Sequence, residues 1–182
     1  GVLTFADPTK LVQDLSKDRD NALAAISEYT AVGGTALYDA LGEGLARLRR
    51  VEGRRVVVVL TDGRDENNPG TAPGSIRTLA DVVAAVKDVG ATIFSIGLGP
   101  RVDQLTLEYL AQASGGEAYF PQDVSVLAAD YHRVLEDLRR RFVISYTSTN
   151  SKHDGGWRTV EVRSRRAGVV ITSLGGYRAP AK

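Results

Sequence analysis

The sequence predicts an α/β fold of three layers, in which helices cover both faces of a doubly wound, mostly parallel sheet. Three observations support this prediction. Residues 56–60 form a continuous and mostly β-branched run, as expected of a central parallel strand covered on both faces. Strand-like and helix-like segments alternate along much of the chain. The 182 residues, 43% of them hydrophobic, suffice for one domain with a substantial core.

The beginning of the chain predicts an antiparallel edge of the sheet. Residues 2–5 indicate a strand and residues 10–15 its hairpin neighbour, because the pair Asp7-Pro8 between them favours a turn. The chain opens directly inside a strand-like run. We therefore expect it to be a piece of a longer protein.

Two helices are expected next. Asp18 or Asp20 can cap a helix that runs to about Tyr29, and Gly33-Gly34 then interrupts the chain. A second helix is expected over residues 36–50. Its leucines recur on one face, which predicts the buried side: Leu37, Leu41, Leu45 and Leu48.

Further βα units follow the strand at 56–60. The loop 63–75 is rich in Gly, Pro and Asn, and a loop of this length at a strand end is more often functional than not. After it we expect a helix with four inward residues: Leu79, Val82, Val83 and Val86. The remaining predicted elements are a strand at 91–98, a helix at 103–113, a short strand at 118–120 and a last helix with a stripe of Leu127, Tyr131, Val134 or Leu135, and Leu138.

From residue 142 the pattern changes to strands only. They are expected at 142–147, 157–163 and 169–174, with apolar and polar residues alternating in the middle one. We therefore divide the chain into an α/β domain, residues 1–141, and a β-hairpin extension, residues 142–182, packed on the same domain.

Two short segments carry the candidate site. Thr61-Asp62-Gly63 ends the apolar strand, and ligands of open α/β sheets bind at the carboxyl edge of the strands, so Asp62 is the first candidate. Gly33-Gly34-Thr35 comes about twenty-five residues earlier and opens a helix. The simpler alternatives are that Thr35 caps the helix and that Asp62 bonds the backbone of a turn.

These segments resemble the second and third metal-binding motifs of the von Willebrand factor type A (vWA) domain. The family assembles its site from Asp-x-Ser-x-Ser after the first strand, a Thr in a Gly-rich loop and an Asp in a Thr-Asp-Gly turn. Thr35 matches the second motif and Asp62 the third. The first motif has no counterpart, and residues 1–7 resemble the family's second strand. The resemblance thus implies that the first strand and helix are missing.

The resemblance has functional consequences. It implies a protein-interaction and adhesion module rather than an enzyme, with a MIDAS-type site for Mg²⁺ or Mn²⁺ that a partner's Asp or Glu completes. Two ligands, Thr35 and Asp62, would hold the ion weakly. The absent central strand implies dimerisation through the gap, unless the flanking strands close on each other. Residues 154–158 and 176–180 resemble the tail of a bacterial subgroup, the vWA-related domains, whose members are often exported, which favours a periplasmic or secreted location.

Other readings remain open or are excluded by composition. A structural domain of an exported protein with a vestigial metal site is one alternative. An aspartyl phosphotransferase using Asp62 is another, although its usual second Asp is here Arg64. A net charge of +1 gives no reason to expect a nucleic-acid partner, and no apolar stretch is long enough for membrane insertion. The partial Asp-x-Ser motifs at Asp14 and Asp123 are more simply helix caps.

Overall fold

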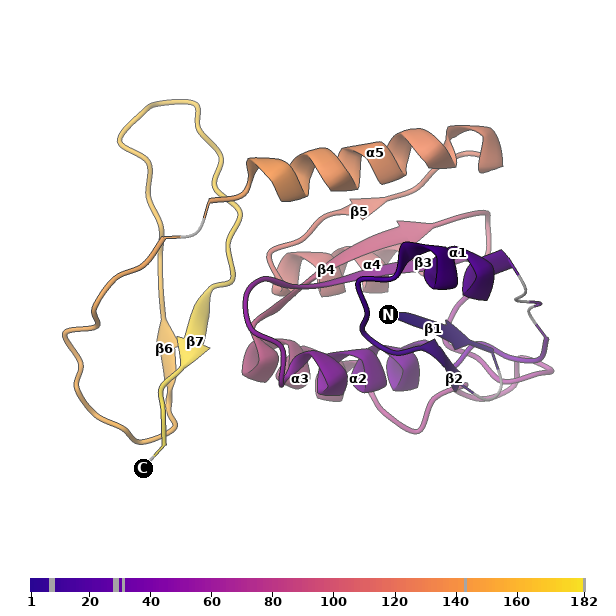
Figure 1. The fold of residues 1–182 in the computed structure, drawn as a ribbon, viewed down its shortest axis with the longest axis horizontal. Helices are drawn as coiled ribbons and strands as arrows, with labels where there is room; N and C mark the ends of the chain where they lie inside the picture. Colours follow the sequence, from indigo (N-terminus) through magenta and orange to yellow (C-terminus); the bar gives the residue numbers. More distant parts are fainter. Residues whose placement is uncertain (7–8, 28–29, 31, 143, 182) are drawn as a thin grey trace.

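The computed structural model describes residues 1–6, 9–27, 30, 32–142 and 144–181. Figure 1 shows the elements, which are β1 (Val2–Phe5), β2 (Thr9–Gln13), α1 (Arg19–Ser27), α2 (Leu37–Leu48), β3 (Arg55–Thr61), α3 (Leu79–Val89), β4 (Ala91–Gly97), α4 (Gln104–Ala113), β5 (Ala118–Tyr119), α5 (Val124–Arg140), β6 (Trp157–Thr159) and β7 (Gly176–Arg178). The turn expected at Asp7-Pro8 and the helix end expected at Tyr29 lie outside the described residues. No helix in the described ranges has both the length and the apolar character needed to cross a membrane.

The central sheet is parallel and confirms the predicted fold class. Its strand order is β3-β4-β5, with Val58 opposite Phe94 and Ser95 opposite Ala118. A helix follows each strand of this sheet: α3 follows β3, α4 follows β4 and α5 follows β5. The ends of α3 are well defined, because it begins with a capping box between Thr78 and Asp81 and ends at Gly90 in the left-handed conformation. The units therefore repeat as strand, loop and helix, with all strand ends at one edge.

Helices cover both faces of this sheet (Figure 1). Ile93 of β4 packs in a core with α2, α3 and α4, whereas its neighbour Phe94 packs on the other face with Val134 of α5. Val134 is 2% exposed and Leu135 is 48% exposed, so the first of the two expected candidates forms the stripe. These alternating contacts produce the three layers.

The β1–β2 hairpin forms a second sheet. The strands pair antiparallel, with Thr4 opposite Lys10, as predicted. Among the described residues, β1 pairs only with β2, and β3 only with β4. The two flanking strands have thus not closed on each other.

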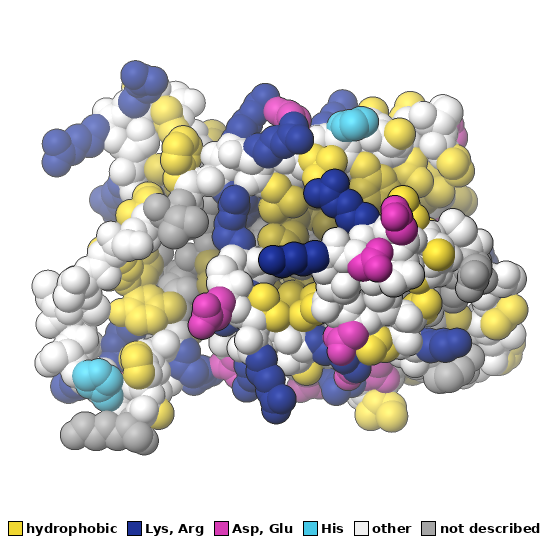
Figure 2. All heavy atoms as spheres, viewed as in Figure 1, with side chains coloured by type: hydrophobic (Ala, Val, Ile, Leu, Met, Phe, Trp, Pro, Cys, Tyr) yellow, Lys and Arg dark blue, Asp and Glu magenta, His cyan; other side chains and the backbone are white. Residues whose placement is uncertain are grey.

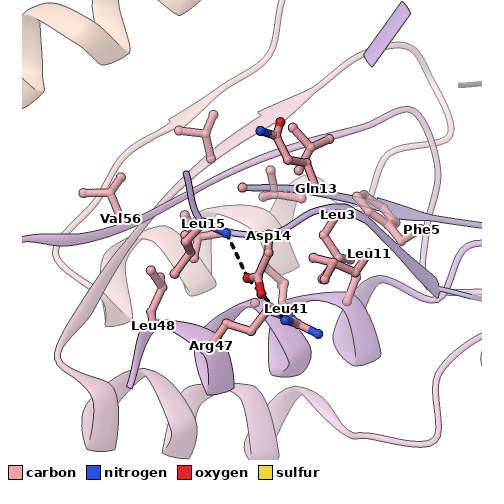
Figure 3. A pocket seen from close by; sticks show the side chains of 17 residues that line it. Leu3, Phe5, Leu11, Gln13, Asp14, Leu15, Leu41, Arg47, Leu48 and Val56 are labelled. Carbon is pink, nitrogen blue, oxygen red and sulfur yellow. Dashed lines mark hydrogen bonds and ion pairs between the residues drawn. The ribbon is translucent and has the colours of Figure 1, made fainter. Parts of the chain in front are cut away.

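A groove separates β1 from β3. It has a volume of ≈ 170 Å³ and is lined by the hairpin, by α2 and by residues 56–59 of β3. Leu3 of β1, Leu41 of α2 and Val56 of β3 are among the residues that line this space, and Figure 3 labels all three. At one end of it, Arg47 lies 3.3 Å from a carboxylate oxygen of Asp14. We call this space the β1–β3 groove.

The C-terminal extension differs from the prediction. Residues 142, 144–147 and 169–174 form no strand, and the middle strand ends at Thr159. Its partner is β7, with Trp157 opposite Arg178 and Thr159 opposite Gly176. The expected strand at 169–174 is wrong because Leu174 packs against the main core and the backbone at 173–174 lies against Gly115, which draws this end of the segment away from β6.

Several contacts join this extension to the α/β layers. Arg178 Nε donates to Asp88 at 2.6 Å, and the ammonium of Lys87 lies 5.7 Å from the centre of the Trp157 ring. Both partners lie at the end of α3, just before β4 begins. The extension therefore meets the α/β layers at the amino edge of the strands, opposite to Asp62.

Candidate functional site

Thr35 and Asp62 lie at the carboxyl edge of β3, in two segments that contact each other. A Cβ atom built on Gly63 would lie 3.3 Å from Thr35 Oγ1. The turn that carries Asp62 therefore runs directly past the hydroxyl of Thr35. The structure places Thr35 beside the turn that carries Asp62.

The backbone of Thr35 is fixed by the loop that follows β3. Its N–H donates to the carbonyl of Glu66 at 2.7 Å, and the N–H of Glu66 donates back at 3.2 Å. Gly34 allows this close approach, because a Cβ there would lie 2.6 Å from the same carbonyl oxygen. Thr35 is consequently held in place by a bridge from residue 66, thirty-one positions away.

Helix α2 receives its N-terminal hydrogen bonds from the same loop. Its N-cap residue, Ala36, has no side chain that could cap it. Instead the N–H of Tyr38 donates to Asp65 at 3.2 Å, and the N–H of Asp39 donates to Ser75 Oγ at 3.0 Å. Thr35 is therefore not the helix cap, because remote side chains satisfy these donors.

Asp65 organises the loop. Besides Tyr38, its carboxylate accepts from the N–H groups of Gly74 at 3.1 Å and Ser75 at 3.0 Å, and from the Ser75 hydroxyl at 2.5 Å. Asp65 is thus partly buried and bonded within the loop rather than free in solvent. A carboxylate with four donors has little remaining capacity for a cation.

Asp39 plays a similar part on the other side of the loop. It accepts from the N–H groups of Ile76 at 2.9 Å and Arg77 at 3.0 Å, and from the Arg77 guanidinium at 3.1 Å. Burial acts to raise the pKa of Asp39, but the three donors outweigh it and the pKa is lowered. This carboxylate is thus ionised and committed to the loop.

The turn at Asp62 is closed by its neighbour. Thr61 Oγ1 accepts from the N–H of Gly63 at 3.3 Å and donates to its carbonyl at 3.2 Å. Asp62 itself is exposed. Within the described ranges, neither the Asp62 carboxylate nor the Thr35 hydroxyl makes a hydrogen bond, so both oxygen groups are available at this edge.

These two groups fit a hard cation in part. Hydroxyl and carboxylate oxygens are ligands that Mg²⁺ and Mn²⁺ accept, with waters filling the other positions. Across the described part of the chain, no cluster of three or more His, Cys, Asp or Glu side chains could hold a metal by itself. The site can therefore supply two ligands and leaves several positions open.

The partial Asp-x-Ser motifs serve other purposes. Asp123 is the N-cap of α5 and accepts from the N–H of Ser125 at 2.7 Å, as the simpler reading predicted. Asp14 is not a cap of α1, since it accepts from Leu15 at 2.8 Å and pairs with Arg47. At the start of that helix Asp18 accepts from the N–H of Asn21 at 3.1 Å.

Sequence reasoning missed Asp39, Asp65 and Ser75, which build the frame around Thr35. One signal could have pointed to them. The helix that begins at Leu37 has no capping side chain of its own at Ala36. Its orphan N–H groups had to find partners elsewhere, and the polar loop after β3 is the nearest source.

Comparisons with known proteins agree with this architecture. A family model described as von Willebrand factor type A domain matches residues 1–133. The chain is 33% identical to Matrilin-1 of Mus musculus over 124 residues, and 36% identical to Matrilin-1 of Bos taurus over 107 residues. These alignments cover 65% and 59% of the chain but only 21% and 16% of the relatives.

Solved structures show the same fold. The chain resembles a structure titled von Willebrand factor type A from Catenulispora acidiphila, with a TM-score of 0.59, 22% identity and coverage of 72% of this chain and 31% of that one. It also resembles proximal thread matrix protein 1 from the mussel byssus, described with a zinc-occupied MIDAS motif, with a TM-score of 0.55, 23% identity and coverage of 75% and 33%. The family match extends over most of the chain, and the chain therefore belongs to the von Willebrand factor type A domain family.

Proposed function

We propose that the chain is a protein-interaction and adhesion module in which Thr35 and Asp62 belong to a divalent-cation site. The observation that supports this proposal is that the Thr35 hydroxyl and the Asp62 carboxylate, at the carboxyl edge of β3, make no hydrogen bond to another described residue. Asp39 and Asp65, their acidic neighbours, are both tied into the loop by hydrogen bonds. The neighbouring structure described with a zinc-occupied MIDAS motif makes zinc a further ion to test beside Mg²⁺ and Mn²⁺.

The proposed chemistry is bridging rather than catalysis. One carboxylate and one hydroxyl would leave a bound divalent ion with net positive charge and open coordination positions. An Asp or Glu side chain of a partner protein could then complete the shell. Two protein ligands are too few to bind the ion tightly, so the partner's carboxylate would contribute much of the affinity.

Mn²⁺ binding tests this proposal directly. The fraction of free Mn²⁺ is measured by electron paramagnetic resonance during a titration of the chain, with and without acetate as a stand-in for the partner's carboxylate. We expect weak binding that acetate strengthens. Asp62→Ala should abolish it and Thr35→Val should weaken it. Asp20→Ala, an exposed Asp on α1, is the matched control and should leave binding unchanged. Zn²⁺ and Mg²⁺ are compared by competition.

Two outcomes would contradict the proposal. If the wild-type chain removes no Mn²⁺ from solution, Thr35 and Asp62 form a vestigial site and the chain is a structural domain. If binding is present but identical in Asp62→Ala, the ion binds elsewhere. Circular dichroism of each variant separates loss of binding from loss of fold.

We also propose that the chain self-associates through the β1–β3 groove. In support, the facing edges of β1 and β3 lack strand partners among the described residues, and the space between them is mainly apolar. Unpaired backbone edges of this kind are a common route to association. Sedimentation velocity over a range of concentrations measures it.

Assignment to the bacterial subgroup and a periplasmic or secreted location are further parts of the proposal. Their support is the resemblance of residues 154–158 and 176–180 to the tail of that subgroup. Cell fractionation of the source organism, followed by immunodetection of the chain, tests the location. Detection in the cytoplasmic fraction alone would contradict it.

A further inference from the structure

A second cavity lies within the C-terminal extension. It has a volume of ≈ 490 Å³ and is lined by residues 146–150, by residues 157–160 and by Tyr177 of β7. Figure 1 shows that the chain between α5 and β6 runs down beside β6 before it turns back into that strand. The cavity is therefore formed between this segment and the β6–β7 hairpin. Its volume is that of a site for a small molecule. We call it the Tyr146–Tyr177 cavity.

Two tyrosine rings form a corner of this cavity. The ring centres of Tyr146 and Tyr177 are 6.2 Å apart, and the ring planes are inclined by 74°. Tyr177 is fixed in β7, opposite Arg158 of β6. Tyr146 is 56% exposed, so much of its side chain is open to solvent. In the same view as Figure 1, Figure 2 shows hydrophobic side chains open to solvent among uncharged polar and backbone atoms where β6 lies. The two rings thus offer a flat apolar surface with a second ring as its wall.

Hydroxyl groups surround the rings. Thr147, Thr149 and Thr159 also line the cavity. Among the described residues, their hydroxyls form no hydrogen bond. A threonine hydroxyl can both donate and accept. The lining therefore matches a ligand whose own polar groups do both.

The lining carries little free charge. Arg158 is the one charged residue among those that line the cavity. Its guanidinium is already engaged, because it donates to a carboxylate oxygen of Asp154 at 2.7 Å and to the carbonyl of Lys152 at 3.1 Å. A phosphate or carboxylate ligand would require an uncommitted cation. The cavity consequently suits a neutral ligand.

A saccharide combines these properties. One face of a pyranose ring consists of C–H groups, which pack on an aromatic ring, and its rim consists of hydroxyl groups, which donate and accept hydrogen bonds. We infer that the Tyr146–Tyr177 cavity binds a neutral oligosaccharide. One sugar ring packs on Tyr146 in the corner formed with Tyr177, and its hydroxyl groups bond to the threonines. This inference does not depend on the proposed cation site, which lies at the opposite edge of the sheet.

Tryptophan fluorescence tests this inference, because Trp157 is the only tryptophan of the chain and lines the cavity. Its ring covers Gly176 and lies 5.7 Å from the ammonium of Lys87, so the reporter is held in place. The chain is titrated with cellotetraose, maltotetraose and N-acetylated chitotetraose. We expect a saturable change in emission with at least one of them. Tetragalacturonic acid, which is anionic, should bind no more tightly than the neutral sugars.

Variants locate the binding. Tyr146→Ala should weaken it about tenfold because the ring on which the sugar packs is removed, whereas Tyr146→Phe should retain it. Thr149→Val replaces a hydroxyl by a methyl group of similar size and should also weaken binding. Tyr109→Ala is the matched control, since Tyr109 is 52% exposed on α4, and it should bind like the wild type. The Trp157 emission of each variant without sugar checks that the hairpin is folded.

Four results would overturn the inference. Equal binding by Tyr146→Ala and the wild type would place the sugar elsewhere. Loss of binding in EDTA would assign it to a cation site. Tighter binding of tetragalacturonic acid would show that the ligand class is wrong. If neither the three neutral sugars nor any neutral glycan on a printed array binds the wild-type chain, the cavity is not a saccharide site, and the proposed cation site is unaffected.

Discussion

Thr35 and Glu66 exchange two backbone hydrogen bonds, of 2.7 and 3.2 Å, across thirty-one positions of the sequence. This bridge places the candidate ligand Thr35 beside the turn of Asp62 before any ion binds. Its geometry depends on glycines that have no side chain at the crossing. The arrangement of the site is thus set by backbone contacts as much as by the two side chains.

Substitution of the crossing glycine should therefore be costly. In Gly34→Ala the new Cβ would lie 2.6 Å from the Glu66 carbonyl oxygen, and we expect a loss of about 1–3 kcal/mol in unfolding free energy. Gly44→Ala is the control, because it adds a methyl group inside α2 in open space and should stabilise by roughly 0.5–1 kcal/mol. Urea denaturation measures both. Equal changes in unfolding free energy in the two variants would contradict the close approach of Gly34 to the Glu66 carbonyl.

The register of α5 predicts opposite results for two adjacent residues. Val134 is 2% exposed and packs with Phe94 and Tyr119, whereas Leu135 is 48% exposed. Val134→Ala should lower the unfolding free energy by about 1–3 kcal/mol because it leaves a cavity. Leu135→Ala should change it by no more than about 0.5 kcal/mol. Thermal denaturation of both variants tests which face of α5 packs on the sheet. A larger loss of stability in Leu135→Ala than in Val134→Ala would show that this orientation of the helix is wrong.

Glu117 should make the stability depend on pH. Desolvation and the nearby Asp137 raise the pKa of Glu117, and the Tyr119 hydroxyl lies between the two, donating to Asp137 at 2.8 Å. Because the folded state holds this proton more tightly than the unfolded state, stability decreases as pH rises above the unfolded pKa of 4.5.

Glu117→Gln removes that charge and should raise the melting temperature at pH 7, with no gain at pH 4. Glu136→Gln, whose partners Arg139 and Arg140 are on the surface, is the control and should have little effect. A gain of the same size at both pH values would assign the effect to packing rather than to ionisation.

Trp157 should hold the proposed extension, residues 142–182, against the α/β layers. Its ring covers Gly176, where a Cβ would lie 2.7 Å from the ring, and Lys87 of α3 lies on it. Trp157→Ala should therefore speed proteolytic cleavage within the extension, while residues 1–141 stay protected. Phe142→Ala, at a residue 91% exposed, is the control. Cleavage of residues 1–141 at the same rate would contradict the division into two parts.

The sequence was sufficient for the α/β part because its signals are local and agree with one another. The run 56–60 predicted a strand, and the leucines of α2 define one buried face. The expected cover on both faces of that strand is only partly present among the described residues, because β3 ends the sheet and Val58 and Leu60 are 41% and 38% exposed. The extension could not be predicted in the same way. Residues 169–174 have the composition of a strand, but contacts of Leu174 with the distant core decide their conformation.

For the candidate site, motifs in the sequence pointed to Thr35 and Asp62, and the structure places Thr35 beside the turn that carries Asp62. The frame that holds them could not be predicted, because Asp65 and Ser75 cap a helix that begins before them in the chain. Ordinary caps are recognised from residues at a fixed spacing next to the start of a helix. A cap supplied by a distant loop has no such spacing and cannot be recognised from the sequence. Whether Thr35 and Asp62 bind a cation stays a prediction.

The extension meets the α/β layers at one edge of the sheet and the candidate site lies at the other. A partner held at Asp62 and a tether attached through residues 142–182 would pull in opposite directions along the strands. Such a load would act on the hydrogen bonds between β3 and β4 in shear, so that seven residue pairs resist together rather than one after another. A domain loaded in this way would transmit tension along its strands.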